Sequence, residues 1–125
     1  MNLKELVFQF LKEEGFCPKE ADFGLEFKAE GKNFLFVYDA DDEKYFRLMM
    51  PAIFQGTEEN REAVLEAMDA NNRGIKVVKT FTFQDGTVWL SFEILADSTP
   101  VIADILPRAL SMLVSAQRSF YEAIG

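Results

Sequence analysis

The sequence predicts an α+β fold, in the order α-β-β-β-α-β-β-α, with an antiparallel sheet packed against helices. Apolar residues recur at helical spacing near both ends of the chain and once in its middle, and two segments alternate with a period of two. Each alternating segment contains an acidic residue followed by glycine, which is typical of a hairpin turn, and the short links make neighbouring strands antiparallel. No linker or repeat interrupts the 125 residues, so we expect one domain over residues 1–125.

The first helix is expected over residues 3–14, where Gly15 ends the pattern, and the first hairpin follows it. The apolar side of this helix consists of Leu3, Leu6, Val7, Phe10 and Leu11. In the hairpin, a Glu30-Gly31 turn joins two strands around residues 23–28 and 34–38. This turn predicts three cross-strand pairs on one aromatic-rich face, which are Phe27 with Phe34, Leu25 with Phe36, and Phe23 with Tyr38.

A third strand and a second helix occupy the middle of the chain. The strand is expected over residues 45–53, with Pro51 at its end or on a sheet edge, because proline has no N–H for the ladder. Thr57 is the predicted N-cap of the helix, since two glutamates follow it in the first turn. The predicted buried stripe consists of Val64, Leu65 and Met68, and the helix is expected to end around Asn71, Asn72 and Gly74.

The second hairpin is expected around Asp85-Gly86, over residues 77–95. A two-residue type I′ turn there needs two positive φ angles, which glycine takes freely and aspartate tolerates. This turn predicts four pairs on an apolar face, which are Phe83 with Val88, Phe81 with Leu90, Lys79 with Phe92, and Val77 with Ile94. Thr82 with Trp89, and Thr80 with Ser91, then occupy the opposite face.

The last helix is predicted to begin at Pro100, capped by Ser98 or Thr99. Pro107 lies inside it and should kink the helix or divide it into a short and a longer part. Its broad apolar face consists of Ile102, Ile105, Leu106, Ala109, Leu110, Leu113, Ala116, Phe120 and Ile124.

Composition excludes several classes of partner. The net charge of −8 predicts repulsion from nucleic acid and from an anionic membrane surface, and basic residues occur as singlets. No apolar run approaches the roughly 20 residues that cross a bilayer. The single cysteine, Cys17, cannot form an intrachain disulfide, and the N-terminal residues lack the pattern of a secretory signal, so we expect a cytoplasmic protein.

The chain contains no histidine, which removes the commonest general base and the usual partner of a catalytic serine or cysteine. Cys17 stands between Phe16 and Pro18 and is interpreted as a partly buried structural thiol. No glycine-rich phosphate loop is present, because Gly31-Lys32 lacks the upstream glycine and the following serine or threonine. We therefore expect no enzyme and no cofactor.

One acidic loop, residues 39–43, is the alternative candidate site. Clustered carboxylates suit a hard cation, so this loop predicts a small-ligand or cation-binding module. The loop departs from the EF-hand pattern, with Lys44 where glycine is required and Met50 where a bidentate glutamate is required. A solvated connection between strands is the other interpretation.

The second face of the sheet predicts a different function. Trp89 falls there, and a large amphipathic ring on a polar face is usually covered by a helix, a partner or a dimer mate. The candidate partner-binding residues are Trp89, Leu35, Val37, Thr82 and Thr80. The leading hypothesis is a non-enzymatic protein-binding domain, expected to be a homodimer that uses the last helix or the Trp89 face.

Residues 70–79, together with Asp85-Gly86-Thr87-Val88 and a strand that ends in Glu93, resemble the YbjN-like bacterial family. In that family a helix ends in an asparagine-containing turn and leads into a hairpin with a Lys-Val start and an Asp-Gly turn. The motif covers residues 70–95, while the order of elements over nearly the whole chain is similar to the type III secretion (Tir) chaperone-like fold. The resemblance implies a small acidic cytoplasmic protein, often dimeric, that binds or regulates other polypeptides and has no catalytic residues to carry over.

Overall fold

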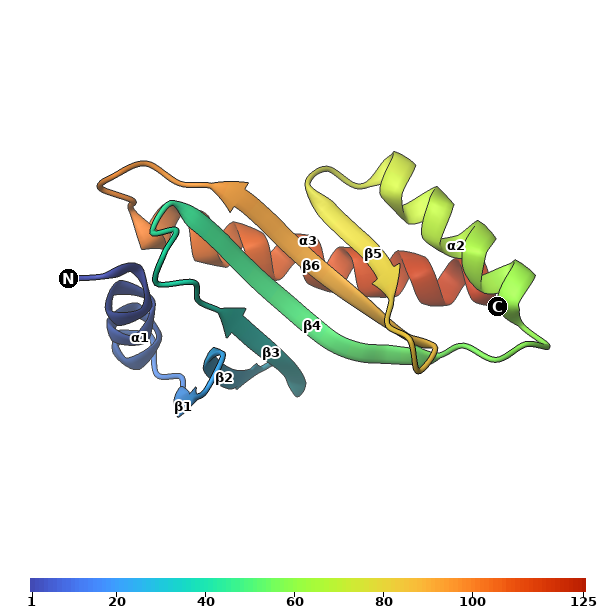
Figure 1. Ribbon diagram of the computed structural model, residues 1–125, viewed down its shortest axis with the longest axis horizontal. Coiled ribbons are helices and arrows are strands. Elements are labelled where there is room, and N and C mark those ends of the chain that lie inside the picture. The colour runs from blue at the N-terminus through green and yellow to red at the C-terminus, as the bar shows by residue number, and fades with distance from the viewer.

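Six strands form one antiparallel sheet in the order β1-β2-β3-β4-β6-β5, and three helices accompany it (Figure 1). The computed structural model describes residues 1–125. Its elements are α1 (Leu3–Glu13), β1 (Lys19–Ala21), β2 (Gly24–Ala29), β3 (Lys32–Val37), β4 (Tyr45–Gln55), α2 (Arg61–Gly74), β5 (Val78–Thr82), β6 (Thr87–Leu95) and α3 (Ile102–Ile124). The predicted α+β class is confirmed, and the short strand β1 is an element that the sequence pattern did not predict.

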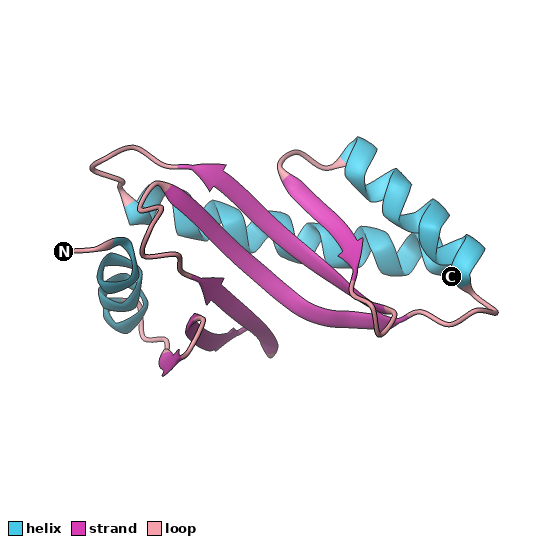
Figure 2. Cartoon of the chain, viewed as in Figure 1, coloured by secondary structure: helices cyan, strands magenta, loops and turns pink.

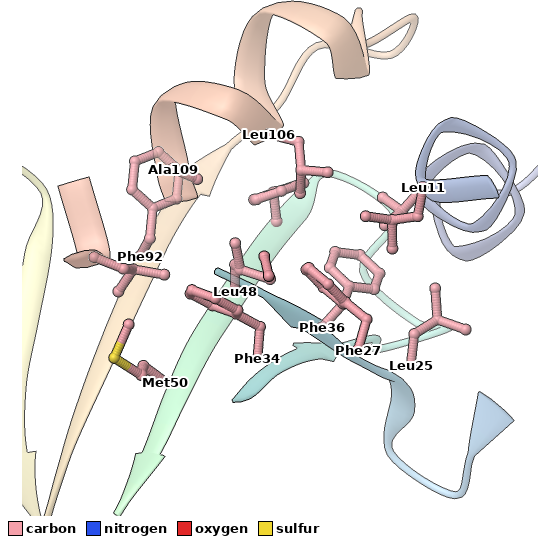
Figure 3. Packing of buried hydrophobic residues seen from close by; sticks show 14 of the residues in the cluster. Leu11, Leu25, Phe27, Phe34, Phe36, Leu48, Met50, Phe92, Leu106 and Ala109 are labelled. Atoms are coloured by element: carbon pink, nitrogen blue, oxygen red, sulfur yellow. The ribbon is translucent and has the colours of Figure 1, made fainter. Parts of the chain in front are cut away.

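All three helices pack on one face of the sheet. The long helix α3 crosses behind β4 and β6, with α1 and α2 toward opposite ends of the molecule (Figures 1 and 2). Leu11 from α1 and Leu106 from α3 lie in one cluster with Phe36 from β3 (Figure 3). The predicted apolar stripe of α3 forms much of this core, with Ile102, Leu106, Ala109, Leu113, Ala116 and Phe120 buried.

The first hairpin has the predicted turn and register. Phe27 pairs with Phe34 and Leu25 pairs with Phe36, and all four side chains are buried. Glu30 and Gly31 have φ angles of 54° and 75°, as a type I′ turn requires at its two central residues. The turn chemistry therefore determined which residues of β2 and β3 face the core.

The second hairpin differs from the prediction by one residue. Phe83 and Thr87 close a three-residue loop, residues 84–86, because the Phe83 N–H donates to Thr87 O at 3.0 Å and the Gly86 N–H donates to Phe83 O at 2.9 Å. Only Gly86 has a positive φ, of 85°, so the turn is not type I′. The Asp85 carboxylate accepts the N–H of Thr87 at 3.0 Å, an Asx interaction that favours the longer loop.

The new register moves side chains between faces. The observed pairs are Thr82 with Val88, Phe81 with Trp89, Thr80 with Leu90, Lys79 with Ser91, and Val78 with Phe92. Phe81 therefore shares a face with Trp89, and Thr80 faces the helices, both opposite to the prediction. A loop one residue longer reverses the facing of every residue of β5.

Pro51 lies inside β4, between β3 and β6, and not at a strand end or sheet edge as predicted. A bulge accommodates it: Met50 pairs with Leu90 and Phe54 pairs with Val88, so residues 51–53 oppose Trp89 alone. Ala52 has a φ of 41° in this bulge. The pairing between β3 and β4 is limited to Leu35–Met49 and Phe36–Leu48, so the missing proline donor leaves no gap in the ladder.

Three predictions about helix ends and faces were wrong. The helix α2 begins at Arg61 with Asn60 at the N-cap, because Thr57 forms a preceding turn in which its N–H donates to Asn60 Oδ1 at 2.6 Å. Leu65, which was predicted to be buried, is exposed. Ala67 is buried beside Val64 instead. At the other end of the chain, Val101 is the N-cap of α3 and no cap hydrogen bond comes from Ser98 or Thr99, while α3 continues through Pro107 as one helix.

The two asparagines near the end of α2 have roles that the sequence pattern did not predict. Asn72 acts as a substitute strand at the outer edge of β5: its Oδ1 accepts the Thr80 N–H at 2.7 Å and its Nδ2 donates to Thr80 O at 3.1 Å. The buried Asn71 donates to Ala116 O at 2.9 Å and so joins α2 to α3. None of the three helices combines the length and apolarity needed to cross a bilayer.

The facing of Phe36 and Phe81 can be tested by one pair of variants. Phe36→Ala should lower the free energy of unfolding by about 3–5 kcal/mol, because it removes a fully buried ring. Phe81→Ala should cost at most about 2 kcal/mol, because its half-buried ring lies on the face without helices. Urea denaturation measures both. Equal losses would contradict the register described above.

Candidate functional site on the open sheet face

No helix covers the face of the sheet opposite the three helices, and we call it the open face, although Met49 and Ser91 on it are buried. Its side chains come from the strand positions that alternate with the core positions. One row of paired residues crosses the whole sheet on this face: Lys19, Glu26, Leu35, Met49, Ser91 and Lys79. The open face therefore combines apolar and charged side chains from all six strands.

Three aromatic residues gather at one end of the open face, and we call Phe81, Phe83 and Trp89 the aromatic cluster. The Phe83 and Trp89 rings meet edge to face, with centroids 4.6 Å apart, and the Phe81 and Phe83 centroids are 5.3 Å apart. The indole Nε1 of Trp89 donates to Thr87 Oγ1 at 2.9 Å, which orients the ring. Phe83 is 46% exposed, so the cluster presents apolar surface to solvent.

A charged network lies beside the apolar part of the open face. The Tyr45 hydroxyl donates to Glu93, and Lys79 Nζ forms an ion pair with Glu93 Oε2 at 3.0 Å. Burial of the Glu93 carboxyl disfavours its ionised form, but the Tyr45 hydroxyl and the Lys79 charge outweigh this effect and lower its pKa. Burial and the neighbouring Glu93 carboxylate raise the pKa of Tyr45.

Arg47 lies next to this network and touches only its tyrosine: the positive charge of Arg47 opposes the rise in the pKa of Tyr45. Its backbone pairs with Glu93 across β4 and β6, yet none of the three ion pairs in the structure includes Arg47. The guanidinium lies over the Tyr45 ring, 5.6 Å from its centroid, and the buried Nε has no hydrogen-bond partner. Arg47 therefore has no carboxylate partner within ion-pair distance on this face.

The structure brings together three of the five predicted partner-binding residues. Trp89, Leu35 and Val37 all lie on the open face and are half-buried. Thr80 and Thr82 do not, because the one-residue change of register turns them toward the helix side, where Thr80 is buried. Sequence reasoning missed Arg47 and Phe81. Only the alternation of residues 45–50 could have placed Arg47 on this face.

A groove of about 760 Å³ lies beside the open face, near the part of β2 that β1 does not pair. It is lined by Phe16, Cys17, Phe27, Phe34, Leu35 and Pro51, together with glycine, asparagine and charged side chains. Cys17 is exposed at this groove, so its predicted partial burial was wrong. The groove extends the apolar surface around Leu35.

The acidic loop forms structural hydrogen bonds. Glu43 accepts the Leu3 N–H at 2.9 Å and the Tyr38 hydroxyl, while Asp39 Oδ1 accepts the Asp41 N–H at 2.9 Å. The hydrogen bond to Glu43 raises the pKa of Tyr38 to about 12. No three acidic or cysteine side chains are grouped so that they could hold a metal ion. The loop fixes the start of α1 against the end of β3.

Comparison with known proteins shows a shared fold without sequence similarity. No protein-family model and no curated protein matches the chain. Among solved structures, YbjN, described as a putative transcription regulator from E. coli, superposes with a TM-score of 0.72 at 10% identity over 98% of this chain and 94% of its own. An uncharacterized protein from Methanothermobacter thermautotrophicus has a TM-score of 0.66 at 15% identity, with coverage of 97% and 95%.

The third similar structure is the Yersinia pestis type III secretion chaperone SycH in complex with a stable fragment of YscM2. Its TM-score is 0.60 at 15% identity, over 94% of this chain and 98% of that chain. The predicted similarity to YbjN and to the type III secretion chaperone-like fold is therefore confirmed over nearly the full length. The two neighbours with a described role are a putative transcription regulator and a secretion chaperone.

The lowered pKa of Glu93 predicts how stability depends on pH. At pH 7 the free energy of unfolding of Glu93→Gln should be about 1–3 kcal/mol lower than that of the unchanged protein, because the substitution removes the charge that strengthens the hydrogen bonds to Glu93. The stabilisation by Glu93 is fully present above the ordinary pKa of 4.5 and is lost as the pH falls through the lower folded-state pKa. Urea denaturation from pH 7 to pH 3 should show the difference shrinking at the acid end. Glu26→Gln, an exposed change on the same face, is the control, and a difference that persists at the acid end would contradict this prediction.

Proposed function

We propose that this chain is a non-enzymatic polypeptide-binding domain and that the open face is its binding surface. The main observation behind this proposal is that all three helices cover one face of the sheet, while the aromatic cluster lies on the opposite face. An isolated exposed apolar residue needs no explanation, but contiguous aromatic rings on a rigid sheet are typical of an interaction site. Trp89 is the expected anchor, because tryptophan is enriched among residues that dominate binding energy.

The comparisons support this proposal at the level of the fold. The SycH structure contains a fragment of another polypeptide, and YbjN is described as a putative regulator. A rigid six-stranded sheet suits such a role, because binding to it orders few groups of the protein itself. We also place the protein in the cytoplasm, where the exposed thiol of Cys17 would stay reduced.

The binding role can be tested with a display library of short random peptides. The immobilised protein should enrich peptides from the library, and Trp89→Ala should bind those peptides at least about tenfold more weakly, because it removes the largest ring of the aromatic cluster. Fluorescence anisotropy of a labelled, enriched peptide measures the affinity.

Leu65→Ala is the matched control, because Leu65 is an exposed apolar residue on α2, on the helix side. It should leave peptide affinity unchanged. Failure to enrich any peptide, or equal binding by Trp89→Ala and the unchanged protein, would refute the proposed function.

We also propose that the protein is a homodimer. Two surfaces are available, the open face and α3, where Tyr121 is 42% exposed and Val101, just before the helix, is 57% exposed. Sedimentation velocity at micromolar concentration should give the mass of two chains. Trp89→Ala should dissociate a dimer formed through the open face and leave one formed through α3 intact, whereas a monomer for the unchanged protein would refute this part.

A further inference from the structure

The open face differs in charge from the rest of the molecule. The chain has a net charge of −8, yet this face carries four basic residues and two acidic ones. The basic residues are Lys19, Lys28, Arg47 and Lys79, and the acidic ones are Glu26 and Glu93. A locally positive surface on an acidic protein favours a partner of negative charge.

Arg47 is the strongest sign of a missing partner. Its nearest acidic candidate across the sheet, Glu93, is already engaged by Lys79 and by the Tyr45 hydroxyl. The buried Nε has no acceptor, although a guanidinium can donate two parallel hydrogen bonds to a carboxylate. Leaving such a group unpaired costs stability within the free protein, and a carboxylate from outside would remove that cost.

Resting on the proposed function, we propose that the open face binds an acidic segment of a partner polypeptide, in which one carboxylate pairs with Arg47 and an apolar side chain packs on the aromatic cluster. The spacing of this segment follows from β6. Glu93, which is paired with Arg47, and Trp89 lie about 13 Å apart along the strand at ~3.3 Å per residue. An extended segment would therefore place its carboxylate and its apolar anchor about four residues apart.

A second copy of this chain fits the surface less well. Two open faces brought together would oppose two locally positive surfaces, each with four basic residues and with Glu26 as its one carboxylate outside an ion pair. An acidic peptide gives both the charge and the apolar anchor. The test below treats self-association as a separate result.

The test uses the peptides that the library selection enriches. These peptides should carry net negative charge, and a labelled one should bind Arg47→Gln about tenfold more weakly and lose affinity as salt is added. The free Arg47→Gln protein should melt at the same or a higher temperature, because the substitution removes an unpaired, partly buried charge. Lys76→Gln is the matched control, since it removes one exposed positive charge outside the open face and should change neither property.

A charge exchange gives a second measurement. Arg47→Glu should reject the acidic peptide and accept the same peptide with lysine in place of its key carboxylate. Enrichment of neutral or basic peptides, or equal binding by Arg47→Gln, would overturn this inference and leave the proposed function standing. A library that yields no peptide at all refutes the proposed function as well, and a change in sedimentation on Arg47→Gln would assign the face to a second copy instead.

Discussion

The packing of α3 on the sheet is the interaction on which the rest of the structure depends. Its buried stripe contacts β4, β5 and β6, and both α1 and α2 contact α3 as well as the sheet. Two polar contacts extend this arrangement, because Asn71 donates to Ala116 O and Tyr121 donates to Ile53 O at 2.6 Å beside the bulge of β4. All three helices thereby lie on one side of the sheet, and no helix covers the other side.

The edges of the sheet are protected while its face is open. At one edge, the Asn72 side chain forms hydrogen bonds with the backbone N–H and C=O of Thr80. At the other edge, β1 has only three residues, two of which are charged. Both devices limit the addition of another strand. The open face keeps the exposed ring of Phe83 and the guanidinium of Arg47, whose buried Nε has no hydrogen-bond partner and which forms no ion pair. This contrast is the reason to assign recognition to the face.

The accuracy of the sequence predictions varied with how locally each feature is determined. The Glu30-Gly31 turn requires positive φ at both positions, so the register of β2 and β3 followed from it. The Asp85-Gly86 pair, by contrast, is compatible with both a two-residue and a three-residue loop. The hydrogen bond from the Thr87 N–H to the Asp85 carboxylate favours the three-residue loop. That difference moved Thr80 and Thr82 off the candidate site and brought Phe81 onto it, whereas Leu35, Val37 and Trp89 were correctly grouped.

The sequence by itself determined the α+β class, the order of the main elements, one hairpin register and the apolar stripe of α3, because each depends on periodicity or on turn chemistry within a few residues. The tertiary structure alone decided that β4 and β6 are neighbours, that a bulge accommodates Pro51, and that Asn72 closes the edge of β5. It also decided that Arg47 has no ionic partner. These features depend on contacts between residues far apart in the chain, which local patterns cannot encode.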